Sequence, residues 1–270
     1  MTVRRVLRGL NRRLLPVSLR APVHARLQRL GLLGSLYQPE LDIIRREVAA
    51  HHRDPWREFE SPTRTFDMRE RVVEVPWVLS RYGGEHTVLD IGTANALGVY
   101  VDGLLQLRVP ELIGLDLSND GDGRVDIVTG DVRRIPFEDE RFDLVTCVST
   151  LEHVGANNRR YGWSDSAAKE GDRDEALAEI RRVLRPGGRM LLTMPFGRHE
   201  EQDWFTQYDW PGWQALIRRS GLEAHEVATY AHSTAGWTIE DPGSLAGIAY
   251  GETGAPAAGA VICADLRRPA

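Results

Sequence analysis

The stretch LDIGTANALG at positions 89–98 has the pattern of a turn that holds a nucleotide-like ligand. An apolar run precedes it and a helical pattern follows, an order that points backbone N–H groups at a ligand. Gly92 stands where such a turn needs a residue without a side chain, and Asp90 places a carboxylate just before it. Ala94 and Ala96 occupy positions where more glycine is expected.

Two further acids follow the next two apolar runs. Asp116 ends the run ELIGLD, and its carboxylate can accept two hydrogen bonds from ribose hydroxyls. Asp131 follows RVDIVTG, where it can meet an adenine amino group while Val132 packs on the ring. For each acid alone, a role as a turn or capping residue is the better explanation. Their positions after successive apolar runs favour one shared ligand site.

The elements that must position these residues alternate between strand and helix from residue 86. Strands are predicted at 86–92, 111–118, 124–131, 142–149, 188–197, 222–230 and 259–268, and helices at 68–84, 95–107, 174–188 and 210–221. Short apolar strands separated by helices indicate a parallel sheet covered on both faces. The last two strands have no helix between them, which predicts an antiparallel pair at the sheet edge. The predicted fold is a doubly wound α/β sheet, in which ligands bind beyond the carboxyl ends of the strands.

The ordered motifs VLDIG, LIGLDLS, TGDVRRIPFEDERFDLVTCVSTLEHV and LRPGGRMLLTMPFG resemble the class I S-adenosylmethionine-dependent methyltransferases. The likeness is strongest to their small-molecule, type 11-like branch; it is strong over 86–197 and weak to 270. The resemblance implies a Rossmann-like sheet of seven strands, mostly parallel with an antiparallel last strand. It also implies S-adenosylmethionine as cofactor, bound over the first two strands.

The resemblance assigns a part of the cofactor to each candidate residue. Asp90 and Gly92 would flank the methionine part, Asp116 the ribose and Asp131–Val132 the adenine. Ser149, after the fourth strand, would line the sulfonium region. Two neighbours complete the predicted cofactor-binding set: Thr93 and Leu117.

The glycine spacing separates two cofactor classes. A dinucleotide turn of the form Gly-x-Gly-x-x-Gly needs glycine at 94 and 97, where Ala94 and Leu97 stand. A sulfonium amino acid has no pyrophosphate and needs fewer bare amides. An NAD(P)-dependent oxidoreductase is therefore the weaker alternative, and a non-catalytic binding protein of the same fold is the third.

The acceptor side of the predicted site follows the fourth strand. Methyl transfer to a hydroxyl requires alignment of the two reactants and removal of a proton. His153 is the candidate base, because an imidazole titrates near neutral pH; the alternative is that Glu152–His153 only braces the loop. Some quinone-pathway relatives bind a divalent metal with an acid three residues before this Glu. That position is Ser149 here, so no metal site is expected.

Two polar stretches with interleaved aromatic residues, 155–174 and 195–213, suit stacking on sugar rings or planar acceptors. The predicted acceptor contacts are Glu152, Asn157, Arg159, Tyr161, Trp163, Arg198, His199 and Trp204. We therefore expect O-methylation of a sugar or glycan-linked small molecule.

The composition limits the remaining function classes. Of the 270 residues 42% are hydrophobic and 27% charged, which is typical of a globular protein. The net charge of −5 argues against nucleic acid as a partner. No apolar run approaches the roughly 20 residues of a membrane span. Cys147 and Cys263 are predicted to be buried free thiols, and the expected location is cytoplasmic.

The N-terminal segment differs from the rest of the chain. Residues 1–39 hold eight arginines and no acid. We predict a basic helical arm and connector at 1–67, with 51–67 as the connector, and the methyltransferase domain at 68–270. Three interpretations of the arm stay open: helices packed on the domain, contact with an anionic membrane or a partner, and a targeting segment.

Overall fold

The chain folds into a central sheet with helices on both faces. The computed structural model describes residues 34–54, 59, 65, 68–121, 123–158, 171–253 and 257–270. The strands of the central sheet are β1 (Thr87–Ile91), β2 (Glu111–Asp116), β3 (Asp126–Thr129), β4 (Phe142–Val148), β5 (Leu184–Pro195), β8 (Glu223–Ser233), β9 (Gly236–Ile239) and β10 (Ala260–Arg267). A separate hairpin is formed by β6 (Glu200–Gln202) and β7 (Phe205–Gln207).

The strand order is β3-β2-β1-β4-β5-β10-β8-β9. Strands β1 to β5 pair in parallel, and the last strand, β10, runs antiparallel to both β5 and β8. The predicted fold class is confirmed. Two details differ: β10 lies inside the sheet, between β5 and β8, and the strand β9, which the sequence pattern did not indicate, forms the edge as the eighth strand.

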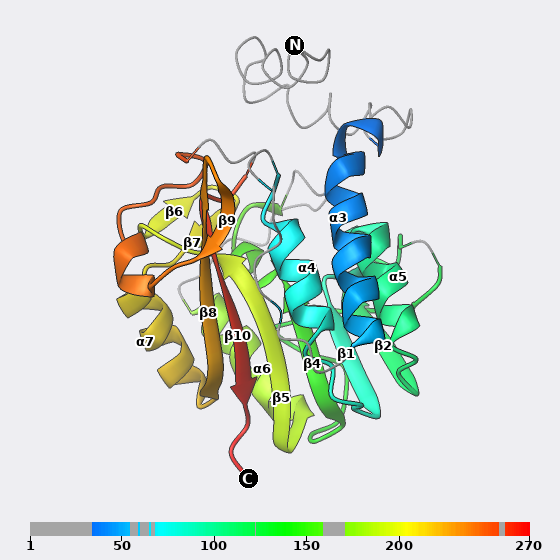
Figure 1. The fold of residues 1–270 in the computed structure, drawn as a ribbon. Helices are drawn as coiled ribbons and strands as arrows, with labels where there is room; N and C mark the ends of the chain where they lie inside the picture. The colour runs from blue at the N-terminus through cyan, green and yellow to red at the C-terminus, as the bar shows by residue number, and fades with distance from the viewer. Residues whose placement is uncertain are drawn as a thin grey trace.

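Helices cover the sheet in two layers (Figure 1). The helices are α3 (Gly34–Arg53), α4 (Arg71–Leu79), α5 (Gly98–Gln106), α6 (Asp172–Val183) and α7 (Trp210–Ser220), with short 3₁₀ turns η1 (Thr93–Asn95), η2 (Leu151–His153) and η4 (Pro242–Leu245). One face packs against α3, α4 and α5, and the other against α6 and α7. All five residues of β1 are buried because helices cover the strand on both sides. Val88 packs in the core beneath α3, α4 and α5, and Leu89 packs in the core beneath α6 and α7.

Helix α3 precedes, in the chain, the segment predicted to form the methyltransferase domain, and it packs in the same layer as α4 and α5. It continues to Arg53, into the stretch expected to be a connector, and packs on α4 and α5 through Ile43, Ile44 and Val48. The basic segment 1–33 lies outside the described residues. Among the residues that the structure describes, no helix is long and apolar enough to cross a membrane. Cys147 and Cys263 are buried and unpaired, as predicted.

Local differences follow from pairing that a single-sequence pattern does not show. The LRPGG motif was expected to be a turn that ends a helix, but β5 begins at Leu184 and pairs with β4 through a register shift. The hairpin β6–β7 lies in a stretch expected to be a loop. Its closing bridge, Phe196 to Tyr208, ties the hairpin to the end of β5.

Edge strand β9 is held by one aromatic side chain. Trp237 is 2% exposed, its backbone N–H donates to Thr65 Oγ1 at 2.8 Å, and its indole N–H donates to the Met68 carbonyl at 3.0 Å. It therefore joins the sheet edge to the segment that leads into α4.

We expect Trp237→Ala to lower the free energy of unfolding by about 3–5 kcal/mol, because it leaves a large buried cavity. Ile239→Ala on the same strand is the matched control: this side chain is 56% exposed, and its loss should cost less than about 0.5 kcal/mol. Urea unfolding followed by fluorescence measures both. Equal effects of the two substitutions would contradict the anchoring role of Trp237.

Candidate active site

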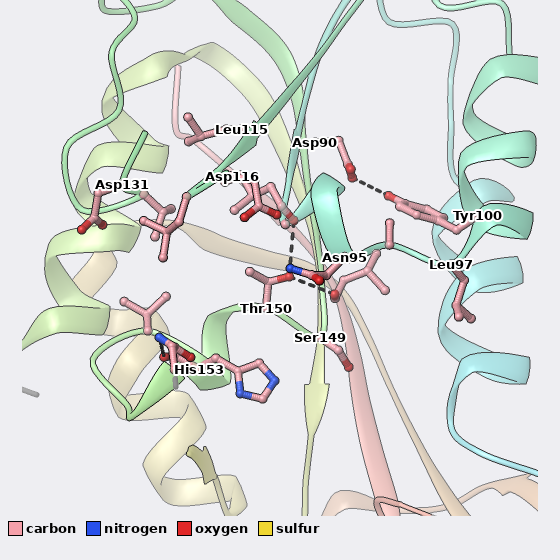
Figure 2. Close-up of a pocket in the computed structure, with 18 of the residues that line it drawn as sticks. Asp90, Asn95, Leu97, Tyr100, Leu115, Asp116, Asp131, Ser149, Thr150 and His153 are labelled. Carbon is pink, nitrogen blue, oxygen red and sulfur yellow. Dashed lines mark hydrogen bonds between the residues drawn. The ribbon is translucent and has the colours of Figure 1, made fainter. Parts of the chain in front are cut away.

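A cavity of about 290 Å³ opens at the carboxyl ends of β1, β2, β3 and β4 (Figure 2). Seven of the eight predicted cofactor residues line it: Asp90, Gly92, Asp116, Leu117, Asp131, Val132 and Ser149. Thr93 is buried and directs its hydroxyl to Asp90 instead. The fold thus brings together residues from four strand ends that lie up to 59 positions apart in the chain.

Asp90 lines the cavity but is almost completely buried, and its hydrogen bonds hold the surrounding elements together. Its carboxylate is 1% exposed and accepts hydrogen bonds from the hydroxyls of Tyr100 (2.6 Å), Thr146 (2.7 Å) and Thr93 (2.8 Å). Burial raises the pKa of Asp90, and the three donors oppose that rise. Figure 2 shows the bond to Tyr100. Asp90 therefore holds the loop after β1 against α5 and β4.

That loop needs a single glycine. Gly92 has φ +89°, and its N–H donates to the Leu115 carbonyl at 2.9 Å. Residues Thr93–Asn95 then form a 3₁₀ turn, in which the Ala94 N–H donates to Asp116 Oδ2 at 2.9 Å. Ala96 has φ −65°, and Ala94 is not among the residues with positive φ. Both alanines therefore fit the loop without strain.

Asp116 and Asp131 differ in their electrostatic settings. Burial raises the pKa of Asp116, although backbone N–H groups, including that of Ala94, oppose the rise. For Asp131, burial is outweighed by the hydrogen bonds and charge of Arg133, which lower its pKa. Arg133 Nη2 lies 2.6 Å from Asp131 Oδ2, and its Nη1 lies 3.1 Å from Asp172 at the start of α6. Asp131 is thus a fixed, ionised acceptor.

His153 lines the same cavity, and its side chain is 18% exposed. Its Nδ1 lies 2.8 Å from the Trp204 carbonyl, and the two rings stack at 5.4 Å. Because a carbonyl only accepts, Nδ1 carries the proton, and in the neutral ring Nε2 keeps the lone pair. The arrangement leaves Nε2 able to take a proton.

Glu152 is buried behind His153. It is 2% exposed and does not line the cavity, although it was predicted to contact the acceptor. Its Oε1 lies 3.7 Å from His153 Nε2, and its Oε2 has no hydrogen-bond partner among the described residues. Burial, together with the charge of Glu74, raises the pKa of Glu152 to about 8. Its carboxyl group is therefore largely protonated at neutral pH.

Ser149 joins the end of β4 to α4. It has φ +43°, and its hydroxyl donates to Glu74 Oε1 at 2.8 Å. The second carboxylate oxygen of Glu74 accepts from Arg71 at 2.6 Å. Within the described residues, no group of three or more His, Cys, Asp or Glu side chains is arranged to hold a metal ion.

The other acceptor candidates that the structure describes do not line the cavity. Arg198 and His199 are exposed, with Arg198 paired to Glu200. Asn157 contacts Asp203, and Trp204 stands behind His153. Three predicted contacts lie outside the described residues: Arg159, Tyr161 and Trp163. Acceptor contact by all these residues stays a prediction.

Several lining residues were not predicted from the sequence. Arg69 precedes α4, and Arg71 and Val75 belong to it; the sequence predicted only a helix at 68–84 here. Others that line the cavity are Asn95, Leu97, Tyr100, Arg133 and Thr150. For Tyr100 the sequence offers one indication of a role near the site: it places a hydroxyl group on the buried face of the helix that follows the turn.

Comparison with known proteins finds a match for the segment around the cavity. Residues 89–192 match the family model described as a methyltransferase domain, and this segment contains every strand end around the cavity. Residues 89–192 are therefore similar to a methyltransferase domain. The cofactor of this family is S-adenosylmethionine. The oxidoreductase alternative is therefore not supported.

Curated relatives match part of the chain. It is 35% identical over 117 residues to a protein of Encephalitozoon cuniculi provisionally named a methyltransferase, covering 41% of this chain and 46% of the relative. It is 29% identical over 110 residues to the ubiquinone/menaquinone biosynthesis C-methyltransferase UbiE of Pseudoalteromonas translucida, covering 41% and 37%. The chain thus spans less than half the length of these relatives. The crystal structure of the [4+2]-cyclase SpnF has a TM-score of 0.50 at 15% identity, covering 88% of this chain and 95% of that one, and shows the shared fold.

The chemistry of the cavity fits S-adenosylmethionine. A carboxylate at Asp116 suits ribose hydroxyls, and Asp131 beside the apolar Val132 and Leu117 suits an adenine ring. Gly92 lets the backbone approach the ligand. These residues would hold the cofactor, with Ser149 and His153 at the acceptor side (Figure 2).

We expect Gly92→Ala to weaken binding of S-adenosylhomocysteine by about tenfold or more. A Cβ there would lie 2.3 Å from Thr150 Oγ1, at a φ that favours glycine, and such strain costs about 1–3 kcal/mol. Ala96→Gly is the control and should change affinity little. Calorimetric titration measures both, and unchanged affinity of Gly92→Ala would show that the loop does not need this geometry.

Glu152 should make stability depend on pH. Its folded-state pKa of about 8 is raised from an ordinary 4.5, so between these values the unfolded chain is ionised there while the folded chain stays protonated. Its contribution to stability therefore falls as pH rises through this window. Glu152→Gln is neutral throughout, so we expect it to gain stability relative to the original chain between about pH 5 and about pH 8.5. Urea unfolding at both pH values tests this; parallel curves would contradict it.

Proposed function

We propose that this methyltransferase transfers the methyl group of S-adenosylmethionine to a hydroxyl of a small-molecule acceptor. The observation that carries the proposal is the position of His153. His153 lines the same cavity as the candidate cofactor residues, and in its neutral ring Nε2 holds the lone pair. O-methylation requires the protein to supply a base within reach of the reacting hydroxyl.

The chain's residues divide the work as follows. When bound, the cofactor supplies an electrophilic methyl group. Asp116, Asp131 and the Gly92 turn orient its nucleoside end, while Ser149 faces the reacting region. His153 Nε2 accepts the hydroxyl proton, and the Trp204 carbonyl keeps accepting the Nδ1–H bond as the ring becomes charged. Part of the His153 ring is exposed, so the proton can pass on to solvent.

The acceptor class is the finer part of the proposal. Polar and aromatic residues near the cavity support a sugar or glycan-linked hydroxyl, and the basic segment 1–39 would suit an acceptor at an anionic membrane surface. The relatives named UbiE are C-methyltransferases, and a base at His153 also serves an acidic carbon. A shared fold does not assign a reaction, as the cyclase SpnF illustrates.

The test is a panel of acceptors incubated with methyl-labelled S-adenosylmethionine: deoxysugar nucleotides, glycolipids and quinol precursors. We expect label in an alkali-stable methyl ether of a sugar. His153→Ala should lower kcat by about 10²- to 10⁴-fold and leave the Kd for S-adenosylhomocysteine unchanged. Label on a carbon atom of the acceptor would contradict O-methylation and show C-methylation instead. Full turnover by His153→Ala would return this residue to a bracing role.

A further inference from the structure

The hairpin β6–β7 docks its turn on the segment that carries His153. Asp203 and Trp204 form the two-residue turn between the strands. The Asp203 carbonyl accepts from the Asn157 N–H at 2.9 Å, and the Trp204 carbonyl lies 2.8 Å from His153 Nδ1. The turn of the hairpin thus contacts the segment after β4 at two points, and one of them is the candidate base.

The hairpin itself is fixed to the rest of the fold. Gln207 in β7 is fully buried, and its Nε2 donates to the carbonyls of Arg198 and Ile248, at 2.9 and 3.0 Å. Phe205 is 1% exposed, and its ring centroid lies 4.5 Å from that of Tyr250. Because these contacts hold the strands in place, the turn gives firm support to the segment that it touches.

Arg173, at the start of α6, ties the hairpin to η2. Its Nη2 donates to Thr206 Oγ1 in β7 at 2.7 Å and to the Glu152 carbonyl at 3.2 Å. Glu152 directly precedes His153 in the chain. Hydrogen bonds from a charged donor are stronger than neutral ones, so one guanidinium holds the backbone next to His153 against the hairpin.

The indole of Trp204 covers one face of the His153 ring. The two planes make an angle of 20° and the ring centroids lie 5.4 Å apart, which is a stacked geometry. Trp204 is held in turn by Phe205 and Tyr250, whose ring centroids lie 4.4 and 5.8 Å from its own. Rotation of the imidazole would therefore lose the stack and the Nδ1 contact together.

We propose that Trp204 is a positioning residue for His153: its carbonyl fixes which nitrogen carries the proton, and its indole fixes the plane of the ring. The inference rests on the proposed function, in which His153 Nε2 takes the proton of the acceptor. It gives Trp204 a role other than the acceptor contact expected from its place in a polar stretch. An imidazole held in one tautomer and one plane needs no rearrangement before proton transfer. An indole face also attracts the positive charge that the ring then gains.

The tautomer of His153 tests the proposal in the whole chain, without cofactor or acceptor. Long-range proton–nitrogen NMR spectra distinguish the Nδ1–H form of a neutral imidazole from the Nε2–H form. The chain has eight histidines, and His153→Gln identifies the signals of this one by their absence. We expect the Nδ1–H form to dominate in the original chain.

Trp204→Ala keeps the backbone carbonyl but removes the stack. We expect it to lower the ratio of the Nδ1–H form to the Nε2–H form by about 2- to 10-fold, the range that follows from the loss of one aromatic pair. Trp204→Leu keeps an apolar side chain against Phe205 and Tyr250 and should lower the ratio similarly. Trp204→Phe keeps a ring over the imidazole and should retain most of the original ratio. The backbone amide spectrum of each variant reports whether the fold is kept.

Trp210→Ala is the matched control. Trp210 is also a half-buried indole, and it stacks on Trp213 with ring centroids 5.4 Å apart. It lies at the start of α7 rather than in the turn of the hairpin. Its loss should leave the tautomer ratio of His153 unchanged.

The possible results differ for the two proposals. A ratio that falls in Trp204→Ala and Trp204→Leu but not in Trp204→Phe or Trp210→Ala would establish the positioning role. An unchanged ratio in Trp204→Ala and Trp204→Leu, or an equal fall in Trp210→Ala, would overturn that role and leave the proposed function standing. Absence of methyl label on any hydroxyl in the acceptor panel would overturn the proposed function without changing the tautomer ratio.

Discussion

The buried carboxylate of Asp90 is the constraint on which the site depends. Three hydroxyl groups satisfy it, and each comes from a different element: Thr93 from η1, Tyr100 from α5 and Thr146 from β4. A buried carboxylate without such donors would cost several kcal/mol, on the order of the whole stability of a domain. The loop, the helix and the neighbouring strand are therefore held in one arrangement around β1.

A second buried carboxylate, that of Glu74, joins the end of β4 to the start of α4. Glu74 accepts from Ser149 at the end of β4 and from Arg71 at the start of α4. Ser149 keeps a positive φ there, a conformation that persists only where the surroundings determine it. The two carboxylates thus hold the two sides of one cavity, and removal of a partner from either would leave an unpaired buried group.

The parts of the site that could be predicted are those carried by strand ends. Asp116 and Asp131 follow apolar runs, and the topology of a parallel sheet brings such positions to one edge. Arg69 and Arg71 could not be found in this way, because their approach to the cavity depends on how α4 packs across the sheet. Strand β9 was missed for a related reason: Trp237 is buried by contacts with Thr65 and Met68, some 170 positions away in the chain.

The alanines of the LDIGTANALG loop show why a departure from a glycine-rich motif need not disable it. Glycine is required where φ is positive or where a Cβ would collide, and in this loop both conditions meet at Gly92. At position 94 the backbone N–H is committed to Asp116, and at position 96 the chain is extended with negative φ. A pyrophosphate would need bare amides at this turn, whereas a ligand recognised by the carboxylates of Asp116 and Asp131 does not. The single glycine of this loop therefore suits a ligand that is recognised through side-chain carboxylates, and the two alanines do not prevent such binding.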